Sequence, residues 1–108
     1  MAFLALASQK SLLTLQKNFY QFQYISIQNQ IQAATAQMTA IEREYSGSNE
    51  NYTDDADYIY YSDLSDSLET EKDSIDSQLT AIENEISGLK TLVNNNIKSS
   101  CTLNLISS

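Results

Sequence analysis

Five aspartates stand close together near the middle of the chain, and carboxylates at short spacing are the ligands that calcium prefers. They are Asp54, Asp55, Asp57, Asp63 and Asp66. An EF-hand loop also requires a central glycine and a terminal glutamate at fixed spacing, and the sequence does not supply this pattern. We interpret the first of these aspartates as acids at the start of a helix, where the helix dipole favours negative charge. No metal or other cofactor is expected.

Catalytic chemistry is limited by the residue types that the chain lacks. Its 108 residues include no histidine and a single cysteine, Cys101. Common zinc sites, Ser-His-Asp triads and Cys-His dyads each need an imidazole or several thiolates. Acid pairs such as Glu69 and Asp73 are predicted on a solvated helix face, without the pocket that would separate their pKa values. The sequence therefore predicts a protein that is not an enzyme.

The composition also argues against nucleic acid and against a membrane span. Only six residues are basic, whereas binding to a phosphate backbone needs a basic patch. The apolar run from Ala2 to Ala7 has six residues, far short of the roughly 20 that cross a bilayer. This opening also lacks the basic start and the length of a signal peptide. We expect an extracellular or cell-surface protein with signal-independent export, and a cytoplasmic location is the alternative.

The charges are segregated along the chain. Residues 1–41 contain Lys10 and Lys17 and no acid, and residues 86–108 contain Lys90 and Lys98 and no acid. All 14 acids lie in the middle, from Glu42 to Glu85, and the formal net charge is −8. A dense acidic run is usually a solvated helix face. The pattern further suggests that the acidic middle faces water while the uncharged ends pack together.

Two long stretches have the hydrophobic periodicity of helices. In the first, apolar residues follow one another at steps of three and four, as in a coiled coil. They are Tyr20, Tyr24, Ile27, Ile31, Ala34, Met38, Ile41 and Tyr45. In the second, the apolar residues again keep to one face, and several are 11 residues apart, which favours a nearly straight helix. They are Leu64, Leu68, Ile75, Leu79, Ile82, Ile86, Leu89, Val93 and Ile97.

A Ser, Gly and Asn segment separates the two stretches and predicts a tight bend. Gly47 provides a helix stop, and Thr53 is the expected N-cap of the second helix. We predict an all-α, coiled-coil-like antiparallel hairpin with helices at about 3–46 and 54–98. The chain, 1–108, is expected to form one domain, with residues 99–108 as a C-terminal tail that is either disordered or adhesive.

The N-terminal third is apolar around much of its circumference, more than one hairpin can bury. The expected assembly interface includes residues of this segment and of the tail: Phe3, Leu4, Leu6, Leu12, Leu15, Phe19, Phe22, Ile27, Leu103 and Leu105. An exposed apolar strip of this extent implies a partner. Self-association is the preferred interpretation, ahead of a different protein and of a membrane surface.

The polar positions of the first helix are mostly glutamines where a solvated helix normally mixes Glu and Lys. They include Gln9, Gln16, Gln21, Gln23, Gln28, Gln30, Gln32 and Gln37. Uncharged amides pack between subunits without the desolvation cost of an ion. This suits subunit contacts or a polar lumen, and a Gln-rich habit of the source genome is the alternative.

The bend resembles a segment of two bacterial families. Residues 40–47, Ala-Ile-Glu-Arg-Glu-Tyr-Ser-Gly, followed by Asn51 and then Asp54-Asp55-Ala56, resemble the stretch after the first helix of flagellins. The layout is similar to helical hairpins that polymerise into type III secretion needles, with the termini inside and the middle outside. The secreted WXG hairpins are a rival resemblance, because Tyr45-Ser46-Gly47 stands where their Trp-X-Gly marks the bend.

These resemblances and the charge pattern lead to one expected function and one alternative. The expected function is a self-assembling subunit of an extracellular or secretion-associated filament or tube, polymerising through its uncharged N- and C-terminal segments. The alternative is a secreted dimeric binding module of the WXG type. In the filament, the bend at residues 46–61 is expected to point outward.

Overall fold

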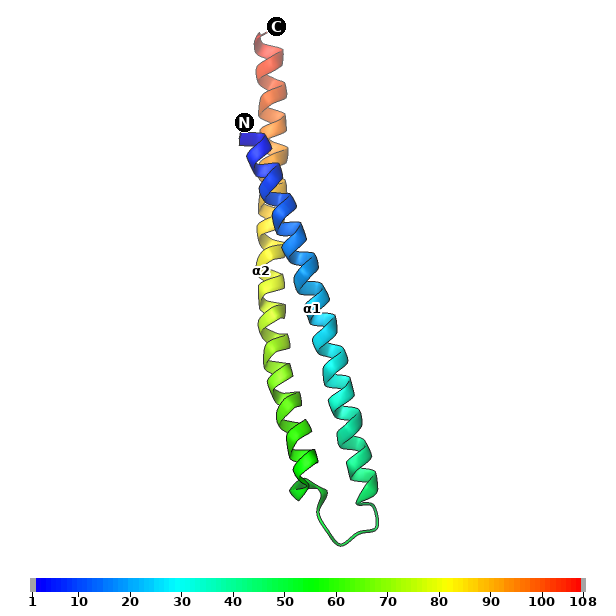
Figure 1. Ribbon diagram of the computed structural model, residues 1–108. Coiled ribbons are helices and arrows are strands. Elements are labelled where there is room, and N and C mark those ends of the chain that lie inside the picture. Colours follow the sequence, from blue (N-terminus) through cyan, green and yellow to red (C-terminus); the bar gives the residue numbers. More distant parts are fainter. Residues whose placement is uncertain (1, 108) are drawn as a thin grey trace. The chain divides into compact units, whose positions relative to one another are not determined.

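The protein folds as two long helices that pack antiparallel, so the prediction of an all-α hairpin is confirmed. The computed structural model describes residues 2–107, and the side chains of residues 5–95. Helix α1 spans Ala2–Glu44, a short 3-10 helix η1 spans Tyr52–Asp54, and helix α2 spans Ala56–Ser107. Figure 1 shows the loop that connects the end of α1 to η1 and α2.

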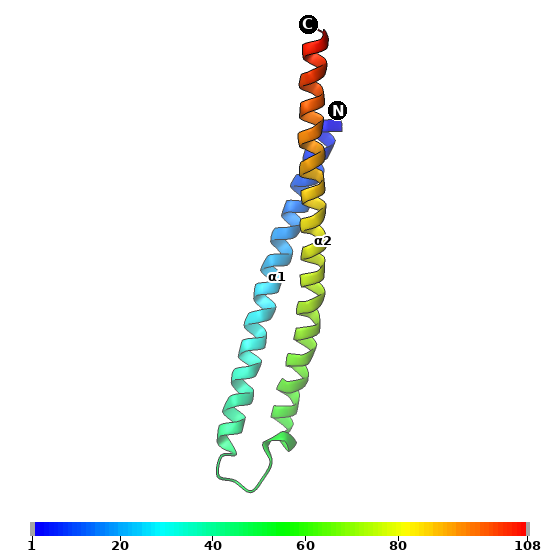
Figure 2. The ribbon, with the colours of Figure 1, turned by 180° about the vertical axis from the view of Figure 1, so that it is seen from behind.

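The helices pack in two compact units, each combining a stretch of α1 with a stretch of α2. Unit 1 consists of Met1–Gln21 and Ser77–Ser108, and unit 2 consists of Phe22–Asp76. The two views of the molecule agree that α1 and α2 run in opposite directions within unit 2 (Figure 1 and Figure 2). Unit 2 also contains the bend and η1.

The buried core lies where the two apolar faces meet. Among residues 5–95, the buried side chains are Ile27, Ala34, Ile41 and Leu68 in unit 2 and Leu79 and Ile82 in unit 1. Ile27, Ala34 and Ile41 follow one another every seven residues, the repeat that keeps one face of a helix against its neighbour. Each pair of helical stretches thus holds together through one narrow stripe of side chains.

Helix α1 ends at Glu44, two residues before the predicted end at residue 46, and Gly47 lies in the turn that follows. The Ser46 amide donates to the Arg43 carbonyl at 3.1 Å, and the Ser48 amide donates to the Tyr45 carbonyl at 2.9 Å. Gly47 itself has a φ of 81°, a left-handed conformation that glycine adopts without a steric penalty.

The predicted N-cap of the second helix is wrong by two residues. The Asp55 Oδ1 atom accepts from the amides of Asp57 at 2.8 Å and Tyr58 at 3.1 Å, which is the geometry of an N-cap. Thr53 instead lies in η1, because its amide donates to Asn51 Oδ1 at 3.1 Å and starts a 3-10 turn. The helix consequently begins at Ala56 rather than at residue 54.

Helix α2 also continues beyond residue 98, through the segment expected to be a tail. It runs to Ser107, and no proline or glycine follows Gly88 to stop it. The uncharged residues of this segment have only moderate helix propensities, but none of them breaks a helix that is already formed.

Candidate assembly surface

Among the side chains of unit 1 that the structure describes, the most exposed apolar ones form a strip on α1. Leu12, Leu15 and Phe19 are 62%, 65% and 59% exposed, and we call these three residues the outer strip. They follow one another at steps of three and four, so they share one face of the helix. Leu13 and Tyr20, on the face toward α2, are half-buried. The outer strip is therefore apolar surface that the hairpin does not cover.

Unit 2 exposes apolar side chains on both of its helical stretches. Phe22 and Ile25 on α1 are 71% and 56% exposed, and Ile59 and Tyr60 at the start of α2 are 45% and 61% exposed. The Tyr60 ring meets the Tyr61 ring edge-on, with centroids 5.2 Å apart. Exposed apolar side chains in this number indicate a partner or an oligomer.

The predicted assembly residues divide into three groups. Leu12, Leu15, Phe19 and Phe22 are exposed, and Leu6 is half-buried. Phe3, Leu4, Leu103 and Leu105 lie outside the residues whose side chains are described. Ile27 is the exception, because the structure buries it.

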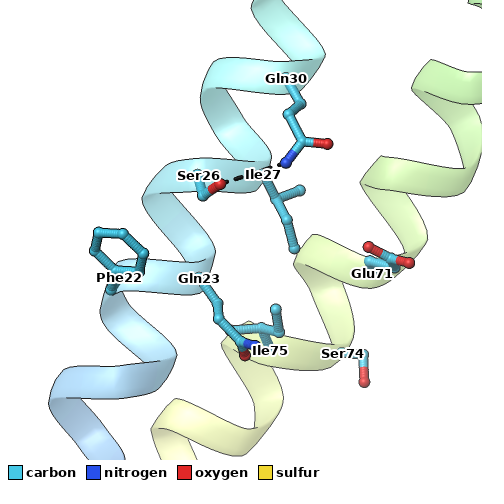
Figure 3. Close-up of a pocket in the computed structure, with 8 residues that line it drawn as sticks. All are labelled: Phe22, Gln23, Ser26, Ile27, Gln30, Glu71, Ser74 and Ile75. Carbon is cyan, nitrogen blue, oxygen red and sulfur yellow. Dashed lines mark hydrogen bonds between the residues drawn. The ribbon is translucent and has the colours of Figure 1, made fainter.

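Ile27 was predicted to belong to the assembly interface, and the structure buries it inside the hairpin. Its side chain is only 7% exposed and points from α1 toward α2 and Ile75, whereas Phe22 points away from α2 (Figure 3). The reason is the helical period, since Ile27 lies seven residues before Ala34 on the face that packs inside the hairpin. Ile27 therefore stabilises the hairpin.

The predicted intra-hairpin residues all lie at buried or half-buried positions. Those that are buried are Ile41, Leu68, Leu79 and Ile82. Those that are half-buried are Tyr24, Ile31, Met38, Ile75 and Ile86.

Unit 1 contains an apolar groove beside the outer strip. The groove has a volume of about 510 Å³ and lies between the two helical stretches. Its lining residues are Gln9, Leu12, Leu13, Gln16, Glu85, Gly88, Leu89 and Leu92. Leu92 is 52% exposed, and no atom lies within 4 Å of the place where Gly88 would carry a Cβ. The groove therefore has an open floor and apolar edges.

Unit 2 contains a second groove, of about 440 Å³, with a more polar lining (Figure 3). The residues that form it are Phe22, Gln23, Ser26, Ile27, Gln30, Glu71, Ser74 and Ile75. The Gln30 side-chain amide donates to Ser26 Oγ at 3.3 Å across one helical turn. The apolar component of this groove is mainly Ile27 and Ile75 at its base.

The two units differ strongly in formal charge. Unit 1 contains four lysines and two glutamates, for a net charge of +2, whereas unit 2 contains two bases and twelve acids, for −10. One lysine of unit 1, Lys17, lies 3.9 Å from Glu83. In unit 2, Lys72 lies 3.2 Å from Glu69, and this hydrogen bond raises the pKa of the lysine. The acids of unit 2 therefore outnumber its bases by twelve to two.

A hydrogen bond links the two sides of the bend. The Tyr45 hydroxyl donates to Asp55 Oδ2 at 2.7 Å. This bond, together with the two backbone amides at Oδ1, lowers the pKa of Asp55, and the same bond raises the pKa of Tyr45. Asp55 therefore caps α2 and also binds the hydroxyl of Tyr45, the residue that follows α1.

The described part of the chain contains no group of three metal-ligating side chains and no helix apolar enough to cross a bilayer. The exposed apolar residues and the grooves remain as the features with a capacity to bind.

Sequence reasoning missed some of the exposed apolar residues. Ile25 and Ile59 were not among the predicted interface residues, because neither belongs to a regular apolar repeat. Leu92 was also missed, because it adjoins Val93 of the predicted apolar face and does not itself belong to that repeat.

Comparisons of this chain with protein-family models, with curated protein sequences and with solved structures give no match. The functional argument therefore depends on the exposed surface and on the distribution of charge.

Proposed function

We propose that this protein is a self-assembling structural subunit that polymerises into an extracellular or secretion-associated filament or tube. The observation that carries the proposal is the outer strip: Leu12, Leu15 and Phe19 each expose more than half of their side chain. Covering such side chains removes apolar surface from water, at about 25 cal/mol for each Å². A partner that contributes an equivalent strip gains the same benefit.

Charge favours a second copy over an unrelated partner as the molecule that covers this strip. Residues 1–41 contain no acid, so two copies meet through this region without repulsion between carboxylates. Contact between two copies of unit 2, each with a charge of −10, would be opposed by both repulsion and desolvation. In the proposed filament the uncharged ends lie inside and the acidic bend lies outside.

Polymerisation needs a contact between two different surfaces of the subunit. A contact of this kind does not close on itself and generates a helical filament. Leu15 and Phe19 of the outer strip are one such surface and the groove of unit 1 is another, because neither residue lines the groove.

The test of the proposal combines sedimentation over a range of concentrations with negative-stain microscopy. The wild-type protein should form long particles as its concentration rises. Phe19→Asp should remain monomeric, because the assembled state would bury an unpaired carboxylate. Ser48→Asp is the matched control, since it adds the same charge at an exposed position of the bend. A wild-type protein that stays monomeric, or a Phe19→Asp variant that polymerises normally, would contradict the proposal.

A dimeric binding module of the WXG type is the second candidate. The observation in its favour is the position of Tyr45-Ser46-Gly47 at the bend, where Gly47 has a φ of 81°. The same experiment separates the two candidates, because discrete dimers at every concentration would favour the module.

A further inference from the structure

The groove of unit 1 has the shape and lining of a docking site for a helix. Leu12 and Leu92 form its exposed edges, and Leu89 is half-buried between them. Gly88 leaves the floor open, because nothing lies within 4 Å of a Cβ built there. An apolar side chain from another molecule can therefore reach the backbone of α2 at this point.

The lining of this groove recurs in unit 2 after two heptads. On α1, Gln9 corresponds to Gln23 and Gln16 corresponds to Gln30, and in each case the second residue comes 14 residues later. On α2, Glu85 and Gly88 correspond to Glu71 and Ser74, again 14 residues away. Each unit therefore has a groove built on the seven-residue repeat. A helix that presents side chains at steps of three and four has the period that matches such a groove.

We propose that the groove of unit 1 receives the outer strip of α1 from a second copy of the chain. This inference rests on the proposed function and specifies its contact. The steps from Leu12 to Leu15 and from Leu15 to Phe19 are three and four residues, so the strip has the required period. Leu15 of the incoming helix packs against Gly88 of the receiving copy.

Charge determines which helix enters the groove. The receiving surface contains one ionised side chain, Glu85, which is exposed. An incoming α1 brings two lysines and no acid within residues 1–41, so it is attracted to this carboxylate. The α2 stretch of unit 1 brings Glu83 and Glu85 together with Lys90 and Lys98, so its net charge is zero and its attraction to Glu85 is weaker than that of α1. The occupant is therefore α1 of the second copy.

The contact can repeat from one copy to the next. Leu12 belongs to both the outer strip and the edge of the groove, whereas Leu15 and Phe19 do not line the groove. A copy that is docked through Leu15 and Phe19 therefore still offers its own groove. Repetition of one contact between unlike surfaces produces an open assembly, as a filament requires.

Gly88→Gln tests the groove without damaging the hairpin. Glutamine has a higher helix propensity than glycine, and the open space at this position accommodates its side chain in the free subunit. In the assembly the same side chain occupies the volume of the incoming Leu15. The concentration at which half of the protein is assembled should therefore rise by roughly tenfold or more. Circular dichroism checks that the helix content is retained.

Ser87→Gln is the matched control for this variant. Ser87 is exposed, precedes Gly88 and does not line the groove, so the same side chain there should change the half-assembly concentration by less than about twofold. If Gly88→Gln assembles like the wild type, or if Ser87→Gln is impaired to the same degree, the groove is not the docking site.

A disulfide experiment identifies the two surfaces directly. In a Cys101→Ser background, Leu15→Cys protein is mixed with Gly88→Cys protein and oxidised under assembly conditions. The disulfide between residue 15 of one copy and residue 88 of the other should exceed both homodimers. A predominance of 15–15 disulfides would show strip-to-strip pairing, which overturns this inference but leaves the proposed self-assembly intact. A protein that never assembles overturns both.

Discussion

Tyr45 and Asp55 connect the end of α1 to the beginning of α2 through side chains alone. Asp55 accepts three hydrogen bonds, one from the Tyr45 hydroxyl and two from the backbone of α2. All three bonds favour the ionised carboxylate, so the pKa of Asp55 lies below its ordinary value. The pKa of Tyr45 lies above its ordinary value, because the neutral hydroxyl is the donor.

These opposite pKa shifts predict how the effect of Tyr45→Phe on the Tm depends on pH. The contribution of Asp55 is present above its ordinary pKa of 3.8 and is lost as the pH falls through the lower pKa of the folded state. The contribution of Tyr45 is present below its ordinary pKa of 10.0 and is lost as the pH rises through its higher folded pKa. The wild type should therefore have a higher Tm than Tyr45→Phe between about pH 4 and pH 10, and the difference should shrink on both sides.

Thermal unfolding followed by circular dichroism from acid to alkaline pH measures this difference. Tyr60→Phe is the control, because the Tyr60 side chain is 61% exposed. Its Tm should follow the wild type at every pH. A Tyr45→Phe difference that is independent of pH would contradict the assignment of the bond to an ionised Asp55.

At the scale of elements, the two glycines have opposite roles. Gly47 ends α1 in a left-handed conformation with a φ of 81°, whereas Gly88 lies inside α2. Neither has an atom within 4 Å of an added Cβ, so steric contact does not distinguish them. The backbone conformation does.

Substitution of each glycine by alanine should therefore change stability in opposite directions. Gly47→Ala forces an L-residue into the left-handed region and should lower the free energy of unfolding by about 1 kcal/mol. Gly88→Ala should raise it by up to about 1 kcal/mol, because alanine is the better helix former. Urea unfolding at a concentration below assembly measures both values. Equal effects of the two substitutions would show that the bend does not depend on the conformation of Gly47.

The helical pattern was readable from the sequence because packing follows the periodicity of apolar residues. The spacing from Tyr20 to Tyr45 predicted the α1 face that lies against α2, and it also placed Leu12, Leu15 and Phe19 on another face. The ends of the elements were less predictable. Thr53 and Asp55 are both good capping residues, and the choice between them depends on the turn that Asn51 starts.

The candidate site was predictable only in part, because the sequence gives the periodicity of each helix but not which residues of the two helices lie opposite each other. The outer strip lies on one helix, so the spacing of its residues was sufficient to predict that they share one face. The groove at Gly88 is formed by two helices, and it depends on which residues of α1 and α2 lie opposite each other. Ile27 was assigned to both the core and the interface until the structure showed its burial.

At the scale of the whole molecule, the distribution of charge determines which part of the subunit faces water in an assembly. Residues 46–51 at the bend are all exposed, and the acids of unit 2 surround them in the sequence. Bringing several such segments together would concentrate carboxylates that have few bases to neutralise them. The proposed filament therefore displays the bend on its outer surface.

A short epitope inserted after Asn49 tests this orientation. The insertion lies in an exposed loop, where added residues seldom disturb a fold, so particles should form as in the wild type. Antibody should then label the assembled particles along their whole length. The same insertion in the monomeric Phe19→Asp variant is the control, because it measures binding to the free loop. Strong binding to that monomer with no binding to assembled particles would place the bend inside the filament and refute the proposed orientation.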